Sequence, residues 1–190
     1  MTDSGKAGDL FAQVPKTKGL PPVHLWNPAF CGDIDMRIAR DGTWFYQGTP
    51  IGRKPMVRLF STIMRRDGDQ YFLITPVEKV GIKVEDAPFV AVELDVQGEG
   101  ESQILRFVTN VEDQTEAGPE HPLRVVIDPQ TQEPSPYVHV RANLEALIHR
   151  NVFYQLVELA VSREIEGQRW LGVWSHGVFF PIGLEPGLEP

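Results

Sequence analysis

The residues best suited to chemistry in this sequence are the arginines of one short basic segment. Between Met36 and Arg66 the chain carries seven basic residues and one acidic residue, a local charge of +6. Arg53 precedes an expected helix, where free backbone N–H groups and the helix dipole favour an anion. Arg58 lies off the apolar face of that helix, and a guanidinium can bind a carboxylate or a phosphate in a bidentate manner. The segment predicts an anion site, arginines paired with carboxylates of the protein, or arginines that are simply solvated.

The rest of the charge is acidic. Residues 77–133 contain thirteen acidic and four basic residues, a balance of −9, and the whole chain has a formal charge of −8. This balance argues against general nucleic-acid binding. The acidic stretch could also be what the basic segment faces.

Other polar and aromatic residues could serve the same ligand. Glu78 and Lys79 follow the basic segment, and Ser175 and His176 stand together at an expected turn. Adjacent side chains of a hairpin point to different faces, so Ser175 and His176 do not predict a nucleophile–base pair. The candidate ligand-binding residues are Trp44, Tyr46, Arg53, Arg58, Glu78, Lys79, Trp174 and His176, with the aromatic rings either stacking on a base or packing in the core.

Known catalytic and metal-binding motifs are missing from the sequence. It has no GxxxxGK[ST] or GxGxxG loop, no HExxH, and no GxSxG around a serine. The five histidines are far apart and show no metal-ligand spacing, and the single Cys31, expected to be a small buried thiol, excludes an intramolecular disulfide. We therefore predict no metal, no cofactor and no catalytic residue, and we leave open whether the protein is an enzyme.

The elements that must position the candidate residues are clearest in the first half. Residues alternate in polarity on either side of Asp41-Gly42, which favours a tight type I′ hairpin. Five apolar residues then follow helical spacing, on a helix that Pro55 can open and Asp67-Gly68 can close; they are Met56, Leu59, Phe60, Ile63 and Met64. A short strand is expected over 71–74.

The second half predicts more strands and one long helix. Strands are expected over 89–96, 103–109, 123–127 and 137–141, and Asn143 can cap a helix that begins at Leu144 and continues through Ala160. Strand, helix and strand occur in this order at Thr43–Pro76 and again at Tyr137–Gly183, a weak repeat of pattern. The fold class is α+β, with two small domains resembling a duplication, each a curled antiparallel sheet with one main helix.

Length and composition set the domain plan. A chain of 190 residues can bury a core without disulfide or metal, and no apolar run approaches the length of a membrane span. We expect a loosely ordered N-terminus over 1–19, an N-terminal domain over 20–86, a C-terminal domain over 87–185 and a loose tail over 186–190. With no recognisable signal peptide, a cytoplasmic location is the expectation.

Longer stretches of the sequence carry a family resemblance. DGTWFYQGTPI followed by RLF and TPVEK, with the earlier PPVHLWNP and the later LGVWSHGVFFPIG, resembles the bacterial family called domain of unknown function 1285 over nearly all of 21–183. The resemblance implies two domains that look like a duplication, with the C-terminal one similar to pleckstrin-homology folds. It implies no established activity, and it suggests a nucleotide-type ligand at the domain interface and a role in signalling.

Three hypotheses of function remain. The first is a non-catalytic ligand-binding or signalling module for a phosphate-bearing, nucleotide-like molecule between the halves. The second is a protein-interaction module that takes a peptide beside the last helix. The third is an enzyme with Glu78, Lys79 or His176 as acid or base.

Overall fold

The computed structural model describes residues 4–16 and 18–187, and it divides the chain into two compact units, Met1–Asp86 and Ala87–Pro190. The predictions for residues 1–3, for Thr17 and for the tail beyond Gly187 lie outside the described residues.

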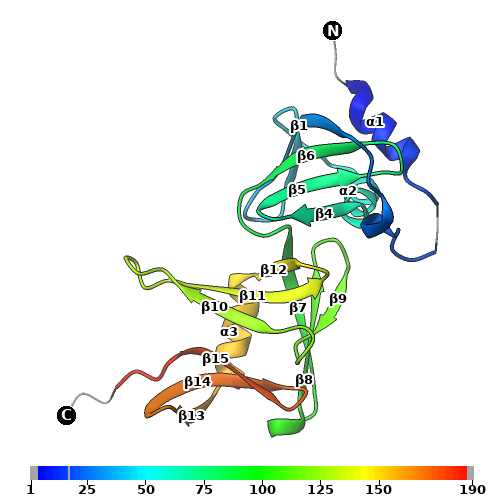
Figure 1. Cartoon of the computed structure of the whole chain (residues 1–190). Helices are drawn as coiled ribbons and strands as arrows, with labels where there is room; N and C mark the ends of the chain where they lie inside the picture. Colours follow the sequence, from blue (N-terminus) through cyan, green and yellow to red (C-terminus); the bar gives the residue numbers. More distant parts are fainter. Residues whose placement is uncertain (1–3, 17, 188–190) are drawn as a thin grey trace. The chain divides into compact units, whose positions relative to one another are not determined.

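The first unit is built on a six-stranded sheet (Figure 1). Its strand order is β3-β2-β1-β6-β5-β4; β1 and β6 are parallel, and all other neighbours are antiparallel. The strands are β1 (Phe30–Ile38), β2 (Trp44–Tyr46), β3 (Thr49–Pro50), β4 (Met64–Asp67), β5 (Gln70–Ile74) and β6 (Lys79–Val84).

Two α-helices and a short 3-10 helix, η1 (Val23–Leu25), accompany this sheet. The predicted helix is present as α2 (Lys54–Thr62), with Pro55 in its first turn and Phe60 buried. Its expected end is wrong, because Ile63 is the C-cap and Met64 already begins strand β4, so Asp67-Gly68 belongs to the β4–β5 hairpin and does not close the helix. The expectation of a loosely ordered N-terminus is wrong for α1 (Ser4–Gln13), because Leu10 on this helix and Val14 just after it are buried and anchor the segment. Ala7 and Leu10, three positions apart on the helix, are both buried and share its apolar face.

The Asp41-Gly42 connection is longer than the predicted type I′ turn. A type I′ turn needs positive φ at both central residues, but only Gly42 has one, at 90°. Ala39 N donates to Thr43 O at 2.9 Å, Gly42 N donates to Ala39 O at 2.9 Å, and Thr43 N donates to the Asp41 carboxylate at 2.9 Å. The Asp41 side chain therefore closes a wider loop between β1 and β2.

The second unit contains a six-stranded sheet and a three-stranded antiparallel sheet. The larger sheet has the order β10-β11-β12-β7-β8-β9, with β7 and β12 parallel and the other neighbours antiparallel. A 3-10 turn, η2 (Gly100–Ser102), precedes β8. The strands are β7 (Phe89–Gln97), β8 (Ile104–Thr109), β9 (Gln114–Glu116), β10 (Leu123–Ile127), β11 (Pro134–Arg141), β12 (Leu144–Ile148), β13 (Val161–Ile165), β14 (Gln168–Ser175) and β15 (Val178–Leu184).

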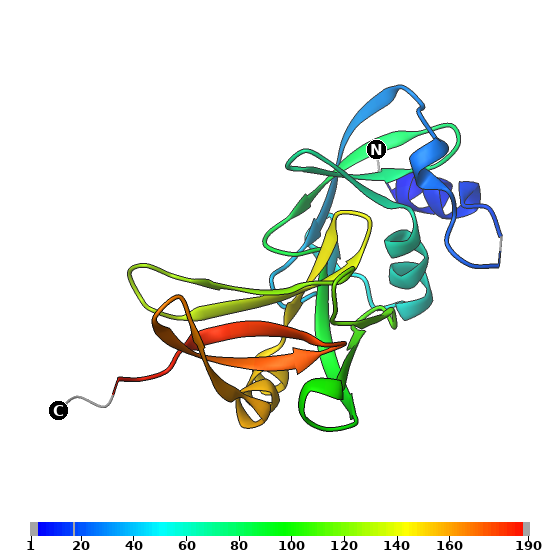
Figure 2. The same cartoon turned by 60° about the horizontal axis from the view of Figure 1, so that its bottom comes forward.

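Helix α3 (Arg150–Leu159) packs against β7 of the larger sheet and β14 of the smaller one (Figure 1). Figure 2 shows β15 running beside β10, so the smaller sheet also contacts the larger one directly. The predicted helix from Leu144 is wrong in its first part, where Leu144, Ala146 and Ile148 are buried in alternation on strand β12. The helix begins only after His149, whose side chain accepts a hydrogen bond from Asn151 N and acts as the N-cap.

The two larger sheets share one strand order. Reading the second from β9 to β10 gives β9-β8-β7-β12-β11-β10, the order of the first with each strand number raised by six. The shared order relates β1–β6 to β7–β12, and not Thr43–Pro76 to Tyr137–Gly183 as expected. The prediction of purely antiparallel sheets is also wrong, because the first and last strands of each set pair in parallel at its centre. Such a pairing joins strands about fifty residues apart, and local polarity does not encode it.

Candidate functional site

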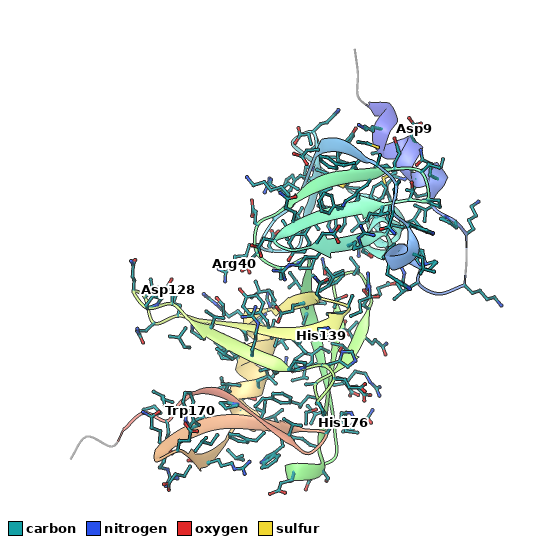
Figure 3. The ribbon with its side chains drawn as sticks, viewed as in Figure 1. Asp9, Arg40, Asp128, His139, Trp170 and His176 are labelled. Carbon is teal, nitrogen blue, oxygen red and sulfur yellow. The ribbon has the colours of Figure 1, made fainter. Side chains whose placement is uncertain are left out.

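A cleft of about 890 Å3 opens on the second unit, and every residue that lines it belongs to that unit. Figure 3 shows His139 and His176 on the same side of this unit. Strands β8 and β9, the loop after β9 and the turn between β14 and β15 supply the lining residues, which are Arg106, Gln114, Thr115, Glu116, Gly118, Pro119, Glu120, His121 and His176. The volume lies in the range of small-molecule sites.

One wall of the cleft is an ion-paired array centred on Glu116. Arg106 stands opposite Glu116 on the neighbouring strand and donates to its Oε1 from Nη2 at 2.7 Å and from Nε at 3.1 Å. The other oxygen, Oε2, lies 2.7 Å from Nε2 of His176. The Arg106 guanidinium, and after it the His176 ring, holds the pKa of Glu116 below its ordinary value, and Glu116 in turn raises the pKa of Arg106.

A pair of histidines forms a second array at the cleft. His121 lies in the loop after β9 and His139 on β11, and their Nδ1 atoms are 2.9 Å apart. The ring centroids are 5.0 Å apart with 32° between the planes. Nε2 of His139 lies 2.5 Å from the carbonyl oxygen of Ala142, which takes a positive φ of 48° in the turn that follows β11.

Buried hydrogen bonds hold the turn that carries His176. The Ser175 side chain is fully buried; its Oγ donates to Ala117 O at 2.6 Å and accepts from Leu105 N at 2.9 Å. His176 N donates to Gln103 O at 3.1 Å. These bonds connect the β14–β15 turn to the start of β8 and to the loop after β9. They therefore fix the backbone from which the His176 side chain projects.

Gly118 lets that loop pass close to His176. A Cβ at position 118 would lie 3.2 Å from Cβ of His176, which is tighter than an ordinary contact. Gly118 and His121 exchange two backbone hydrogen bonds, at 3.0 and 3.2 Å. The loop therefore brings His121 to the cleft by a short turn whose first residue packs on His176.

The sequence-predicted residues of the first unit do not form one site. Trp44 is 1% exposed and its ring stacks on Phe60 with centroids 6.5 Å apart, so of the two alternatives for the aromatic rings it takes packing in the core. Tyr46 is half-buried on β2. Arg53, the N-cap residue of α2, and Arg58 on the helix are both exposed.

Glu78 and Lys79 lie at the start of β6. Lys79 Nζ contacts the Asp67 carboxylate at 2.9 Å and lies 4.2 Å from the centre of the Phe72 ring. Glu78 is half-buried, and its Oε2 is buried without a hydrogen-bond partner among the described residues. Lys79 thus serves a structural ion pair.

Most of the basic segment is neutralised within the first unit. Each of four arginines pairs with a nearby carboxylate, at 2.5 to 3.5 Å; the pairs are Arg37–Glu85, Arg40–Asp86, Arg65–Asp67 and Arg66–Asp69. Arg53 and Lys54 make no ion pair among residues 4–16 and 18–187. Lys54 and Arg58 are four positions apart on α2 and share a face.

Trp174 and His176 belong to the second unit. The Trp174 ring is half-buried, 5.4 Å from the Phe179 ring and 5.1 Å from the Arg163 guanidinium, and it does not line the cleft. His176 is the one sequence-predicted residue that does line it. Cys31, expected to be buried, is exposed.

The sequence hypothesis missed Arg106, Glu116, His121 and His139. They come from three strands and a loop between positions 106 and 139, and only the antiparallel pairing of β8 with β9 and the position of β11 bring them together. Arg106 lies between the apolar Leu105 and Phe107 on β8, which was the available signal. No group of three metal-ligating side chains is found in the described ranges.

The fold is that of a two-unit α+β protein with mixed sheets, and comparison with known proteins gives the family. The chain belongs to the DUF1285 family: the model described as "Domain of unknown function (DUF1285), N-terminal domain" matches residues 21–87, and "Protein of unknown function (DUF1285), C-terminal domain" matches 88–182. A comparison with curated proteins finds no match.

Two solved structures of the family are similar to this chain. A DUF1285 family protein from Silicibacter pomeroyi DSS-3 is 60% identical, with a TM-score of 0.84, over 92% of this chain and 93% of that one. A DUF1285 family protein from Shewanella baltica OS155 is 28% identical, with a TM-score of 0.52, over 66% of this chain and 91% of that one. None of the helices in the described part of the chain is long and apolar enough to cross a membrane.

Proposed function

We propose that the protein is a non-catalytic binding module, and that the cleft of the second unit takes a small anionic molecule that carries a phosphate, such as a nucleotide. The observation that carries the proposal is one cleft of ligand size that presents a guanidinium and two imidazoles, from Arg106, His121 and His176. A module of this kind can serve in signalling, which is what the family resemblance implies.

The charges of the cleft support an anion. Glu116 is occupied by Arg106 and His176, so its charge is compensated within the wall. The rings of His121 and His176 each use one nitrogen within the protein, and the second nitrogen of each can face a ligand. A protonated imidazole and a guanidinium both donate strong hydrogen bonds to phosphate oxygens.

The surroundings of Ser175 support a binding role over a catalytic one. A nucleophilic serine needs an exposed hydroxyl and a base within hydrogen-bond reach. The Ser175 hydroxyl is buried and bonded to two backbone groups, so the serine beside His176 is structural. Thr115, the hydroxyl residue in the cleft lining next to Glu116, is also buried, and its Oγ1 donates to His139 O at 2.8 Å, so it too serves the structure.

The test is ligand-dependent stabilisation of the full chain. A ligand that binds the folded state raises the melting temperature by mass action, so adenosine and guanosine mono- and diphosphates should raise it in a saturable way. His176→Gln and His121→Gln should reduce the shift.

The matched control is Arg53→Gln with Arg58→Gln on α2 of the first unit. These residues belong to the candidate anion site of the basic segment, and their loss should leave the shift unchanged. A shift lost in the α2 variant and kept in the cleft variants would move the site to α2, and no shift with any phosphate compound would refute the proposal.

A second candidate function is protein interaction. Tyr154 and Val157 on α3, and Val161 just after it, keep 55, 45 and 46% of their surface exposed, which favours a contact beside this helix. A photo-crosslinking residue at position 157 should then capture a defined partner in bacterial lysate, whereas the same residue at exposed Lys83 should not. Equal labelling at both positions would count against this candidate.

We further propose that the two halves arose by duplication, which the shared strand order of the larger sheets supports. The pleckstrin-homology-like character of the second unit stays a prediction. A structure-based alignment of β1–β6 on β7–β12 tests the duplication. Superposition of the second unit on pleckstrin-homology folds tests its predicted similarity to them.

A further inference from the structure

The hydrogen bonds of His139 determine which of its nitrogens carries the proton. A backbone carbonyl can only accept, so the 2.5 Å contact with Ala142 O requires an N–H at Nε2 of His139. In the neutral ring Nδ1 is then an acceptor. His139 therefore accepts from its partner at Nδ1 and donates to the backbone at Nε2.

The same reasoning fixes His121. Its Nδ1 lies 2.9 Å from the acceptor Nδ1 of His139, so His121 must donate from Nδ1. Its remaining nitrogen, Nε2, is on the opposite edge of the ring from His139. With Nδ1 already protonated, any further proton on His121 has to go to Nε2, which turns that atom from an acceptor into a donor.

His176 differs from His121 in what balances its charge. Nε2 of His176 faces the Glu116 carboxylate, so a positive charge on this ring has a negative partner within the protein. The hydrogen-bond partner of His121 is a neutral imidazole, which orients the ring but supplies no negative charge. An anion in the cleft would supply the missing charge.

We propose that the cleft binds its anion together with a proton, that His121 is the residue that takes up this proton, and that His139 is the positioning residue that holds His121 with Nε2 available. The inference rests on the proposed function, since it concerns the same cleft. The anion is identified only as a phosphate, sulfate or similar oxyanion group, whose oxygens accept from Nε2–H of His121.

The other charged groups around His121 come from several elements. Behind His139, Glu145 stands opposite it on β12 and is held by Arg124. The titratable and charged groups that share the cleft are Arg106 on β8, Glu116 on β9, Glu120 in the loop of His121, and His176 in the β14–β15 turn. Glu116 is paired with Arg106 and His176, which leaves Glu120 as the acidic side chain in the cleft lining with no ion pair among the described residues.

The test is sulfate binding to the full chain between pH 5.5 and 8, followed by NMR. Sulfate keeps its charge over this range, so any pH dependence belongs to the protein. If one proton is taken up on binding, Kd should rise with pH over this range by up to about tenfold per pH unit. His121→Gln should abolish this slope.

Variants at position 139 separate positioning from packing. His139→Gln keeps a side-chain acceptor for Nδ1–H of His121, so it should keep most of the pH dependence of the sulfate Kd. His139→Leu removes the acceptor and should reduce this pH dependence. His176→Gln is the matched imidazole control and should weaken sulfate binding while leaving the slope. Circular dichroism of each variant checks that the unit remains folded.

Ring-nitrogen NMR of the free protein tests the arrangement without a ligand. At pH 8 His139 should show the Nε2–H tautomer and His121 the Nδ1–H tautomer, and the opposite tautomer at either ring would overturn the inference. Sulfate binding with no pH slope, or a slope unchanged in His121→Gln, would also overturn it and leave the proposed function standing. No saturable binding by sulfate or phosphate at any pH would overturn both.

Discussion

Ser175 shows how much one buried hydroxyl can hold together. Its Oγ is bonded to the amide of Leu105 and to the carbonyl of Ala117, two backbone groups that lie about sixty to seventy residues away in the chain. Both partners are buried, so neither can turn to water when the hydroxyl is removed.

We expect Ser175→Ala to lower the free energy of unfolding by about 2–3 kcal/mol, because a buried donor and a buried acceptor lose their partner. Urea unfolding followed by tryptophan fluorescence measures the change. Ser102→Ala is the control, since the exposed Ser102 hydroxyl bonds only to Glu99 O, and it should cost less than about 0.5 kcal/mol. Equal losses in the two variants would contradict the assigned role.

Asp67 is one of the residues through which acid should destabilise the first unit. Hydrogen bonds from Arg65, and after it from Lys79, hold the pKa of Asp67 below its ordinary value of 3.8. A carboxyl whose pKa is lowered in the folded state stabilises the protein fully when the pH is above its pKa in the unfolded state. This stabilisation is lost as the pH falls through its pKa in the folded state.

Asp67→Asn should therefore destabilise the protein at pH 7 by up to about 1 kcal/mol, because the carboxylate is partly exposed and its ion pairs are screened. The difference from the unmodified protein should shrink as pH falls below 3.8. Denaturant midpoints at a series of pH values measure it. Asp69→Asn, at a fully exposed position, should show neither effect.

At the scale of elements, the β4–β5 turn depends on its glycine. Gly68 has a φ of 62°, in the region where a side chain is strained, although nothing lies within 4 Å of the position that a Cβ would take. Gly52, before α2, has the same open surroundings and no positive φ. The two positions therefore match in the space around an added Cβ and differ in whether φ is positive.

We expect Gly68→Ala to cost about 1 kcal/mol and Gly52→Ala to be neutral or slightly stabilising, because alanine reduces the freedom of the unfolded chain. Thermal unfolding of the two variants measures the contrast. A loss at both positions would mean that crowding, and not φ, is decisive.

Sequence patterns were informative for elements whose pairing is local. The apolar spacing and Pro55 predicted the beginning of α2, and the expected turn at Ser175 and His176 joins β14 to β15. Leu144, Leu147 and Ile148 have the spacing of a helix, whereas Leu144, Ala146 and Ile148 alternate as in a strand. Only the neighbouring strands β11 and β7 decide for the strand. Short apolar runs do not distinguish these two structures.

At the scale of the whole molecule, the candidate site could not be read from the sequence because it is assembled by long-range pairing. His121 and His139 are eighteen residues apart, and Glu116 and His176 sixty. The basic segment attracted attention through its local charge, but carboxylates as far away as Glu85 and Asp86 neutralise part of it. His176 was found because it stood beside a serine at a turn, although that serine proves structural.

Each unit has a buried core of its own, so we expect residues 1–86 to fold as an isolated fragment. Its largest fully buried side chains include Trp44, Phe60 and Leu73, and all of them are contributed by the fragment. A dispersed amide spectrum and a cooperative thermal transition would confirm this. Leu73→Ala should lower the free energy of unfolding of the fragment by about 2–5 kcal/mol. An amide spectrum of the unmodified fragment without dispersion would contradict the expectation.

The parallel pairing of first and last strands has a consequence for synthesis on the ribosome. In each larger sheet the two central strands are the first and the last of their set to be made, β1 with β6 and β7 with β12. The hairpins on either side can form as they emerge, but the centre must wait until Lys79–Val84, or Leu144–Ile148, has left the exit tunnel. Until then β1 and β7 each expose an unpaired edge to the cell, and these two strands are where a nascent chain of this protein would be most exposed to aggregation.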